Sequence, residues 1–373
     1  MTSITINGHD LHAAVSLAAR AIPSRVRVPI LSGVLVETGE DRITVSAFDY
    51  DTRVTATAPA VITSPGRFVV SGRLLSSISR AVDASPIIDI THDGGSVTVR
   101  EGRSEWTLPV MPIEEYPQLP ELGEKIGTVT AGHLRDVVSR VVFAAARDDT
   151  IPMLTAVKIE SSGRFLDLAA TDRFRLSTDT VTWEPEGEQS LDELVPAKLL
   201  EHAVKGFRLD TDPVAIHRSD GGIGFATDNF VITARCLAEK FPPWRRLIPD
   251  PDQATTSVVV DTGALLDAAG RAALAAGDLQ RIRIHIGDGS AEITAVDEDT
   301  RSRVELPLIE HTGESITVGV NCAYVREGVA HAPGGKVRIV FTAPNRPVLI
   351  TPVDSDTAYR HLVMPLRLVG GEP

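Results

Sequence analysis

The sequence is poor in cysteine and has no long apolar run. Its two cysteines, Cys236 and Cys322, among 373 residues cannot form a disulfide framework and fit a reducing cytosol. No apolar run reaches the roughly 18 residues that a membrane span needs. The N-terminus has no basic region followed by an apolar core, so it does not resemble a signal peptide. We therefore expect a cytoplasmic protein with no membrane partner.

Catalytic and cofactor motifs are also missing from the sequence. It contains no GxGxxG, GxxxxGK[ST] or HExxH pattern, so the common nucleotide and zinc motifs are excluded. Its ten histidines show no metal-ligand spacing, and we expect most of them to be solvated. No serine, histidine and aspartate order suggests a nucleophile. We expect no catalytic residue, no metal and no cofactor.

The charge balance at first argues against a nucleic-acid partner. The chain has 37 basic and 50 acidic residues, which give a formal net charge of −13. Net charge says little, however, if the two signs are segregated in space. The distribution of charge therefore matters more than the total.

The sequence contains an internal threefold repeat. Residues 28–37 match residues 151–160 at an offset of 123, and a third copy matches the second over residues 282–297 at an offset of 125. A repeat of about 120 residues can bury its own core and is a domain rather than a solenoid unit. We place three domains at residues 1–124, 125–251 and 252–373.

Each repeat predicts two helices and several alternating strands. Apolar residues at Leu11, Ala14, Val15 and Ala18 follow the spacing of an amphipathic helix. Residues 43–47 alternate apolar and polar side chains, as a half-buried strand does. The fold class is α+β, with two helices on antiparallel sheets in each domain. The six helices are expected at residues 8–22, 72–83, 131–147, 197–208, 262–274 and 321–331.

An aspartate recurs at one place in all three repeats. Asp49, Asp172 and Asp297 occupy equivalent positions, and three like carboxylates could suggest acid–base chemistry. A residue present in every copy is better explained as the cap of a turn.

The predicted helices carry the positive charge. They contain eleven basic and six acidic residues, which leaves 26 basic and 44 acidic residues elsewhere. If the helices share one face, that face attracts phosphate without reading sequence. The alternative is that amphipathic helices simply carry solvated charges. The threefold repeat favours the first interpretation because it gives the helices a reason to align.

At this point the sequence resembles the bacterial sliding clamp family, the beta subunit of DNA polymerase III, over essentially its whole length. The order and spacing of several short segments carry the resemblance: residues 28–31, 111–117, 170–176, 241–246 and 363–368. The resemblance implies a DNA-clamp fold of three repeated domains, a head-to-tail homodimer that closes into a ring, and sequence-independent binding of double-stranded DNA. It also implies partners that bind through short peptide motifs, namely the polymerase III alpha subunit, the clamp loader, other polymerases and repair proteins. Such a processivity subunit has no active site of its own.

The resemblance also implies three sets of site residues. Arg25 matches the family's DNA-contacting loop, and helix position adds the other DNA-binding candidates: Arg73, Arg80, Arg135, Arg140, Arg147, Lys198, Lys205 and Arg271. The subunit interface is expected at Trp106 and Leu108 of one copy and Ala273 and Leu274 of the other. The partner-peptide pocket between the second and third domains is expected to comprise Leu154, Thr171, Arg173, Phe174, Arg175, Leu176, Pro242, Arg246, Leu247, Asn321, Tyr324, Leu362, Met364, Pro365, Leu366 and Arg367.

Two departures from the family pattern stand out. The family usually has Gly-His where this chain has Arg173 and Phe174, which places a cation and an aromatic ring at the pocket wall and predicts a reshaped pocket with altered affinity. The chain also runs past Leu368 by five residues, where the family typically stops. Both features suggest a divergent or second-copy clamp.

Two alternatives from other classes stay open. A three-domain scaffold predicts monomers that ignore DNA. An enzyme with its site between repeats predicts a cluster of titratable groups in one copy, and the sequence shows none.

Overall fold

The computed structural model describes residues 1–23, 25, 27–250, 253–287, 289–297 and 300–367. Contacts between residues divide the chain into two compact units. Unit 1 comprises Met1–Gly132, Glu184–Gln189 and Lys198–Cys236, and unit 2 comprises His133–Trp183, Ser190–Ala197 and Leu237–Pro373. The middle repeat contributes to both units. The domain boundaries at residues 124 and 251 stay a prediction, and residue 251 lies outside the described residues.

Unit 1 is built on one long antiparallel sheet. Its strand order is β14-β10-β16-β17-β18-β4-β3-β2-β6-β9-β8-β7-β1-β5. The pairing of β18 with β4, from Phe230↔Ala56 to Ala234↔Thr52, makes the first and second repeats continuous. The strands are β1 (Thr2–Ile6), β2 (Gly33–Thr38), β3 (Arg42–Phe48), β4 (Thr52–Pro59), β5 (Val61–Ser64), β6 (Arg67–Ser71), β7 (Ile88–His92), β8 (Ser96–Glu101), β9 (Ser104–Met111), β10 (Glu124–Thr130), β14 (Glu184–Pro185), β16 (Pro213–Ser219), β17 (Gly222–Thr227) and β18 (Phe230–Arg235).

Unit 2 contains two antiparallel sheets. The larger has the order β15-β11-β12-β13-β27-β26-β25-β19-β23, and the smaller has the order β22-β21-β20-β24. The pairing of β13 with β27, including Leu176↔Leu362, joins the second repeat to the third. The strands are β11 (Ala156–Ser162), β12 (Phe165–Thr171), β13 (Arg175–Thr182), β15 (Asp192–Pro196), β19 (Thr256–Asp261), β20 (Arg281–Gly287), β21 (Ser290–Asp297), β22 (Thr300–Pro307), β23 (Glu310–Gly313), β24 (Ile316–Asn321), β25 (Lys336–Phe341), β26 (Val348–Pro352) and β27 (Arg360–Val363).

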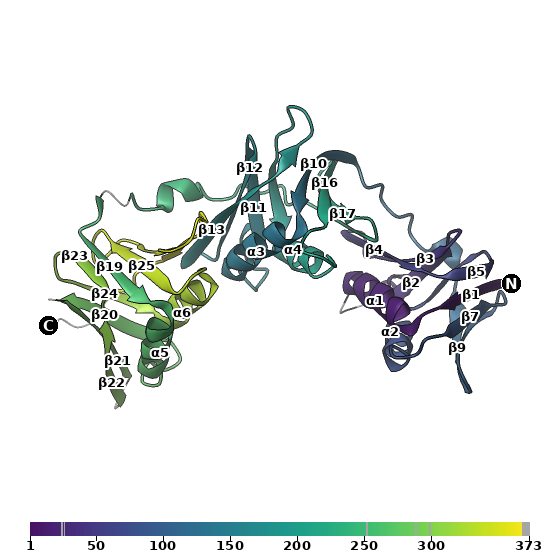
Figure 1. The fold of residues 1–373 in the computed structure, drawn as a ribbon, viewed down its shortest axis with the longest axis horizontal. Helices are drawn as coiled ribbons and strands as arrows, with labels where there is room; N and C mark the ends of the chain where they lie inside the picture. Colours follow the sequence, from purple (N-terminus) through teal and green to yellow (C-terminus); the bar gives the residue numbers. More distant parts are fainter. Residues whose placement is uncertain (24, 26, 251–252, 288, 298–299, 368–373) are drawn as a thin grey trace. The chain divides into compact units, whose positions relative to one another are not determined.

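Two helices belong to each repeat, as the sequence predicts. α1 packs beside α2 and over β3 and β4 in unit 1, and α5 packs beside α6 in unit 2 (Figure 1). α1 begins after Asn7, whose side chain accepts a hydrogen bond from the N–H of His9, and α5 begins after Asp261 in the same way. The six helices are α1 (Gly8–Ala18), α2 (Gly72–Ala81), α3 (Ala131–Val141), α4 (Ala197–Val204), α5 (Thr262–Ala273) and α6 (Cys322–His331).

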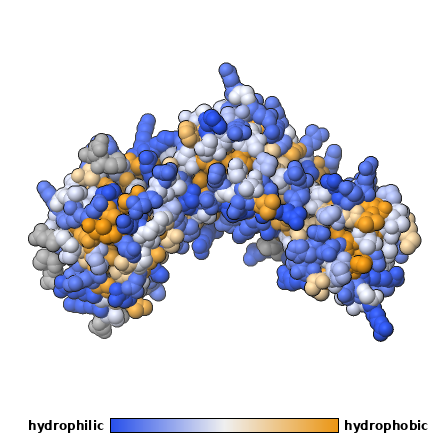
Figure 2. All heavy atoms as spheres, in the orientation of Figure 1, coloured by the Kyte–Doolittle hydropathy of each residue, from blue (hydrophilic) through white to orange (hydrophobic). Residues whose placement is uncertain are grey.

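The amphipathic stripes form the core as expected. Leu11, Ala14, Val15 and Ala18 of α1 are buried, because one stripe of the helix faces the sheet. The corresponding stripe of α5 packs into a core cluster with Val258, Ile282 and Ile293. On the face drawn in Figure 2, hydrophilic residues cover most of the surface and apolar ones form scattered patches. Burial of the apolar stripes is what holds the helices against the sheets.

Several helices end earlier than the sequence predicts. α3 stops at Val141 and continues as a 3-10 turn over Val142–Ala144, so Arg147 lies beyond it. Arg20, Lys205 and Arg208 also follow the ends of their α-helices. With these bounds the six α-helices hold seven basic and five acidic residues. The excess of positive charge within the helices is therefore smaller than predicted, and part of it sits just past the helix C-termini, where the helix dipole favours cations.

Candidate functional site

Unit 2 contains a small cavity, called the apolar pocket below. Its volume is about 210 Å³, which suits one apolar side chain of a bound segment better than a whole small molecule. Far-separated parts of the chain meet here, and nine of the sixteen predicted pocket residues line it: Leu154, Thr171, Arg173, Arg175, Leu176, Pro242, Leu247, Leu362 and Met364.

Local structure explains how these side chains meet. Leu176 and Leu362 are paired on β13 and β27, so both face the same side of the sheet. Leu247 ends the short 3-10 helix η6 (Trp244–Leu247) and packs on the same cluster. Leu154 comes from the 3-10 helix η5 (Pro152–Thr155). The pocket floor is therefore also part of the core of unit 2.

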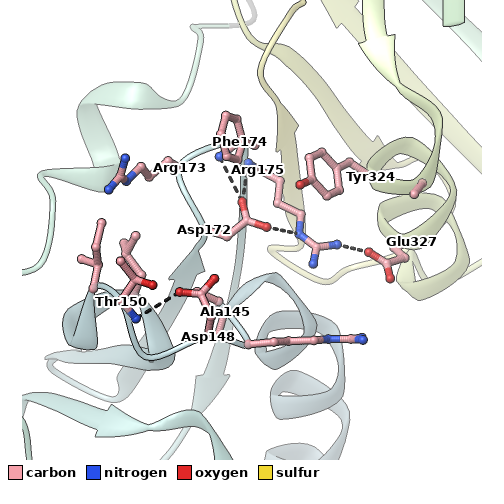
Figure 3. Close-up of a pocket in the computed structure, with 14 residues that line it drawn as sticks. Ala145, Asp148, Thr150, Asp172, Arg173, Phe174, Arg175, Tyr324 and Glu327 are labelled. Atoms are coloured by element: carbon pink, nitrogen blue, oxygen red, sulfur yellow. Dashed lines mark hydrogen bonds and ion pairs between the residues drawn. The ribbon is translucent and has the colours of Figure 1, made fainter. Parts of the chain in front are cut away.

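A larger and more polar cavity, called the polar cleft below, adjoins the apolar pocket. Its volume is about 500 Å³ (Figure 3). It shares Leu154, Arg173 and Arg175 with the apolar pocket. Its other lining residues are Ala145, Ala146, Arg147, Asp148, Thr150, Ile151, Asp172, Phe174, Ala323, Tyr324 and Glu327.

The turn between β12 and β13 places two of the three residues that the cavities share, Arg173 and Arg175. Oδ1 of Asp172 accepts hydrogen bonds from the N–H groups of Phe174 and Arg175, both at 3.0 Å. Asp49 caps the equivalent turn of the first repeat by accepting from the N–H of Thr52 at 2.6 Å. The predicted turn-capping role is thus confirmed for Asp49 and Asp172. The turn after Asp297 includes residues 298–299, which lie outside the described residues.

This turn holds its second residue in the left-handed region. Arg173 has φ +80° and Tyr50, at the equivalent position of the first repeat, has φ +76°. Residues with a Cβ rarely adopt this conformation because the Cβ crowds the following carbonyl oxygen. At this turn the capping aspartate and Thr171, whose hydroxyl oxygen accepts from the N–H of Arg173 at 3.2 Å, hold the backbone in place.

Arg175 is the buried centre of the site. Its side chain is 6% exposed and pairs with Asp172, Nε to Oδ2 at 2.9 Å, and with Glu327 of α6 (Figure 3). It also donates to the carbonyl of Phe143 at 2.8 Å and lies over the Tyr324 ring, 4.7 Å from its centroid. Two carboxylates therefore neutralise its charge, and the network ties β13 of the second repeat to α6 of the third.

Arg173 differs from Arg175 in its surroundings. Its side chain is exposed, and no residue in the described ranges pairs with its guanidinium. Figure 3 shows it on the side of the turn away from Tyr324 and Glu327. Hydrogen bonds from Thr150 lower the pKa of Asp148, and the positive charge of Arg173 contributes to that lowering.

Phe174 lies in the polar cleft. Its side chain is 56% exposed and lines the polar cleft rather than the apolar pocket. Arg173 lines both cavities, whereas Phe174 lines the polar cleft alone. Tyr324 also lines the polar cleft. The remaining predicted residues line neither cavity: Arg246, Asn321, Pro365, Leu366 and Arg367.

Those remaining residues have structural partners or surface positions. Asn321 caps α6 by accepting from the N–H of Tyr324 at 3.2 Å. Leu366 donates its N–H to the carbonyl of Gly319 at 2.8 Å. Arg246 and Arg367 are exposed. Leu368 and the extension from Val369 to Pro373 lie outside the described residues.

A buried histidine beneath the site escaped the sequence reasoning. His361 of β27 is fully buried, an exception to the expectation that most histidines are solvated. Its Nε2 lies 3.1 Å from the carbonyl oxygen of Tyr324, which can only accept, and its Nδ1 lies 3.2 Å from the Ser177 hydroxyl. Burial, and then the charge of Arg175, lower the pKa of His361 to about 3. The only signal in the sequence that could have indicated the burial of His361 is the strand alternation of position 361 with Leu362 on β27.

We predict that acid destabilises unit 2 through His361. Because the pKa of His361 is lower in the folded protein than in the unfolded chain, the unfolded chain takes up the proton at a higher pH. The stability contributed by the neutral side chain is therefore complete above pH 6.5 and declines as the pH falls toward 3. Between pH 8 and pH 5 this loss amounts to about 2 kcal/mol. Denaturant unfolding at the two pH values should show it, and His361→Gln should flatten the dependence by that amount. Equal slopes in both proteins would contradict the assignment.

The predicted DNA-binding residues occupy varied environments. Arg73 and Arg80 of α2 and Lys198 of α4 have exposed side chains, as have Arg25, Arg147 and Lys205 outside the helices. Arg135 is half-buried. Arg271 is exposed and pairs with Asp267 at 2.7 Å.

Arg140 is not an exposed cation. Its Nε lies 2.5 Å from Oδ2 of the buried Asp179 on β13. Burial raises the pKa of Asp179 more than the ion pair with Arg140 lowers it. Arg140 therefore joins α3 to β13, and its position on the helix alone did not reveal this partner.

The predicted interface residues also include both buried and exposed side chains. Leu108 is buried in unit 1 and Trp106 is half-buried, so Leu108 belongs to the core of its own domain. Ala273 is half-buried, whereas Leu274 is 85% exposed at the end of α5. Over Ser104–Pro109, β9 pairs only with β8 among the described residues, and β22 likewise pairs only with β21. Each unit thus presents an open strand edge here, in addition to the other terminal strands of the sheets, which are β14 and β5 in unit 1 and β15, β23 and β24 in unit 2.

Searches for other kinds of site found nothing within the described residues. No three histidine, cysteine, aspartate or glutamate side chains there are grouped to hold a metal ion. No helix in the same ranges is long and apolar enough to cross a membrane.

Comparison with known proteins identifies the family. Models of the N-terminal, central and C-terminal domains of the DNA polymerase III beta subunit match residues 2–120, 128–243 and 245–367. A beta sliding clamp of Streptomyces coelicolor is 34% identical over 98% of this chain and 100% of its own length. One from Micrococcus luteus is 33% identical over 81% of this chain and 97% of its own. The crystal structure of the Bacillus subtilis sliding clamp, at 24% identity, superposes with a TM-score of 0.90 over 99% of this chain and 100% of that one. The chain therefore belongs to the beta sliding clamp family, the beta subunits of DNA polymerase III, and functions as a sliding clamp in DNA replication.

Proposed function

We propose that two copies of this chain close head to tail into a ring around duplex DNA and hold polymerases there. The observation that carries the proposal is that β9 in unit 1 and β22 in unit 2, near the predicted interface residues, each have an edge without a strand partner among the described residues. An open edge invites pairing with another chain, and a heterologous interface of two different edges closes into a ring when the rotation permits. The family membership supports this reading.

Binding to DNA is proposed to be independent of sequence. The exposed cations Arg73, Arg80 and Lys198 lie on helices, and Arg25 lies in a loop. Lysine and arginine contacts to phosphate neutralise charge without reading bases, which suits a ring that slides. Arg140, held by Asp179, is not proposed as a DNA contact.

The apolar pocket is proposed to be the docking site for partner segments, among them those of the polymerase III alpha subunit and the clamp loader. It is largely apolar and is lined by side chains from strands, turns and 3-10 helices, with the unbranched Met364 at its wall. Such a surface suits short extended segments from several partners. We further propose that the chain has no active site of its own, so that its role in polymerisation is to tether. Arg173 and Phe174 favour a divergent copy with a modified pocket as the second candidate.

Retention on circular DNA tests the ring. We expect the loaded protein to stay on nicked circular plasmid through gel filtration and to leave after a single cut, because a ring slides off free ends. Loading requires a clamp loader from a related bacterium and ATP, and the uncut plasmid is the control. Equal loss from circular and linear DNA would refute encirclement.

A further inference from the structure

The apolar pocket carries one positive charge that the protein does not neutralise. Its only charged lining residues are Arg173 and Arg175. Asp172 and Glu327 pair with Arg175, whereas no described residue pairs with the guanidinium of Arg173. Asp148, across the polar cleft, is the acidic group whose pKa responds to Arg173, and it does not line the apolar pocket. An anion from outside can therefore approach Arg173 at the pocket rim.

The backbone holds Arg173 in this position at a cost. Hydrogen bonds to Thr171 and Asp172 fix the turn, and φ of +80° at Arg173 is a conformation that glycine adopts without strain. Tyr50 shows that the turn belongs to the repeat, since it has φ +76° in the first copy. The turn therefore keeps its backbone conformation with different side chains at this position. A residue held in a strained conformation at the rim of a pocket suggests a role in binding.

We propose that Arg173 makes the pocket select partner segments in which an acidic side chain flanks the apolar residue that enters it. The proposal rests on the docking role proposed above and specifies its ligand. The cavity of about 210 Å³ accepts the apolar side chain, and the guanidinium at the rim binds the neighbouring carboxylate through two parallel N–H···O bonds. Phe174 plays no part in this selection because, unlike Arg173, it does not line the apolar pocket.

A pair of matched peptides tests the proposal. Both are acetylated and amidated decapeptides with the same central leucine and phenylalanine, flanked by glutamates in one and by glutamines in the other. We expect the glutamate peptide to bind the intact protein about fivefold more tightly at low salt, since a carboxylate at a partly exposed arginine gains a modest amount. The preference should shrink at 0.5 M salt because screening weakens it. Isothermal titration or fluorescence anisotropy measures both affinities.

Three variants of Arg173 and one of Phe174 locate the source of the preference. Arg173→Gly and Arg173→Ala should each abolish it, the first also relieving the strained backbone without lowering the melting temperature, and Arg173→Lys should retain part of it. Phe174→His, the neighbouring substitution, should leave the preference intact.

The outcomes separate the inference from the docking role. Equal binding of both peptides to the parent protein would overturn the selection by charge while leaving the docking site in place. A preference that survives Arg173→Gly would overturn the assignment to Arg173. If neither peptide binds, the docking role of the pocket fails along with the inference, whereas retention on circular DNA would still report on the ring.

Discussion

Replacing Arg175 with alanine is expected to destabilise unit 2 by about 3 kcal/mol, because breaking a buried ion pair leaves its partner uncompensated. Arg175 is 6% exposed and Asp172 is 13% exposed, so Asp172 would keep a desolvated charge without its partner. The Phe143 carbonyl would lose its donor, and the Tyr324 ring its cation. Glu327, at 39% exposed, can turn to water and limits the loss. Urea unfolding followed by circular dichroism measures the change.

Arg173→Ala is the matched control for that experiment. It removes an arginine from the same turn, but one whose guanidinium has no partner among the described residues. Its unfolding midpoint should stay close to that of the parent. Glu327→Gln should fall between the two, since it keeps a hydrogen-bonding group opposite Arg175. If Arg175→Ala unfolds at the same urea concentration as the parent, the ion-pair network does not join the repeats in the way described.

The sequence predicts the repeated helices and strands well because each rests on a local pattern. The apolar stripe of α1 is buried, and so are Ile43, Val45 and Ala47 of β3, although Ser46 between them is buried too. The end of α3 could not be found in this way. Ala144 and Ala145 remain buried past Val141, so the apolar pattern continues through a 3-10 turn and no glycine or proline marks the stop.

The site was predictable only in part, for a different reason. Leu176 and Leu362 are brought together by strand pairing between repeats, Leu154 joins them from η5, and the family resemblance supplied that knowledge. Nothing local reveals that Asp179, 39 residues away, holds Arg140. The left-handed backbone at Arg173 was equally hidden, because arginine is not typical of that conformation. Such pairings and backbone angles are properties of the folded chain.

Leu274 provides the sharpest test of the proposed ring. It is 85% exposed at the end of α5, so Leu274→Asp should leave unit 2 folded. In the proposed assembly this side chain is buried against the partner copy, where an unpaired carboxylate is strongly unfavourable. We expect the dimer to weaken by at least about 100-fold. The measured mass at micromolar protein should fall from about twice 39.9 kDa to the single-chain value.

Leu209→Asp is the control for this substitution, because Leu209 is also an exposed leucine but lies in the middle repeat, between α4 and β16. The Leu209→Asp protein should remain dimeric and be retained on circular DNA. The Leu274→Asp protein should become monomeric and should also lose retention, since an open chain cannot encircle a duplex. Dimerisation and retention on circular DNA must be lost together. A Leu274→Asp protein that is monomeric yet still retained on closed plasmid would show that something other than encirclement holds it there. A parent protein that is itself monomeric at micromolar concentration would remove the basis of the ring altogether.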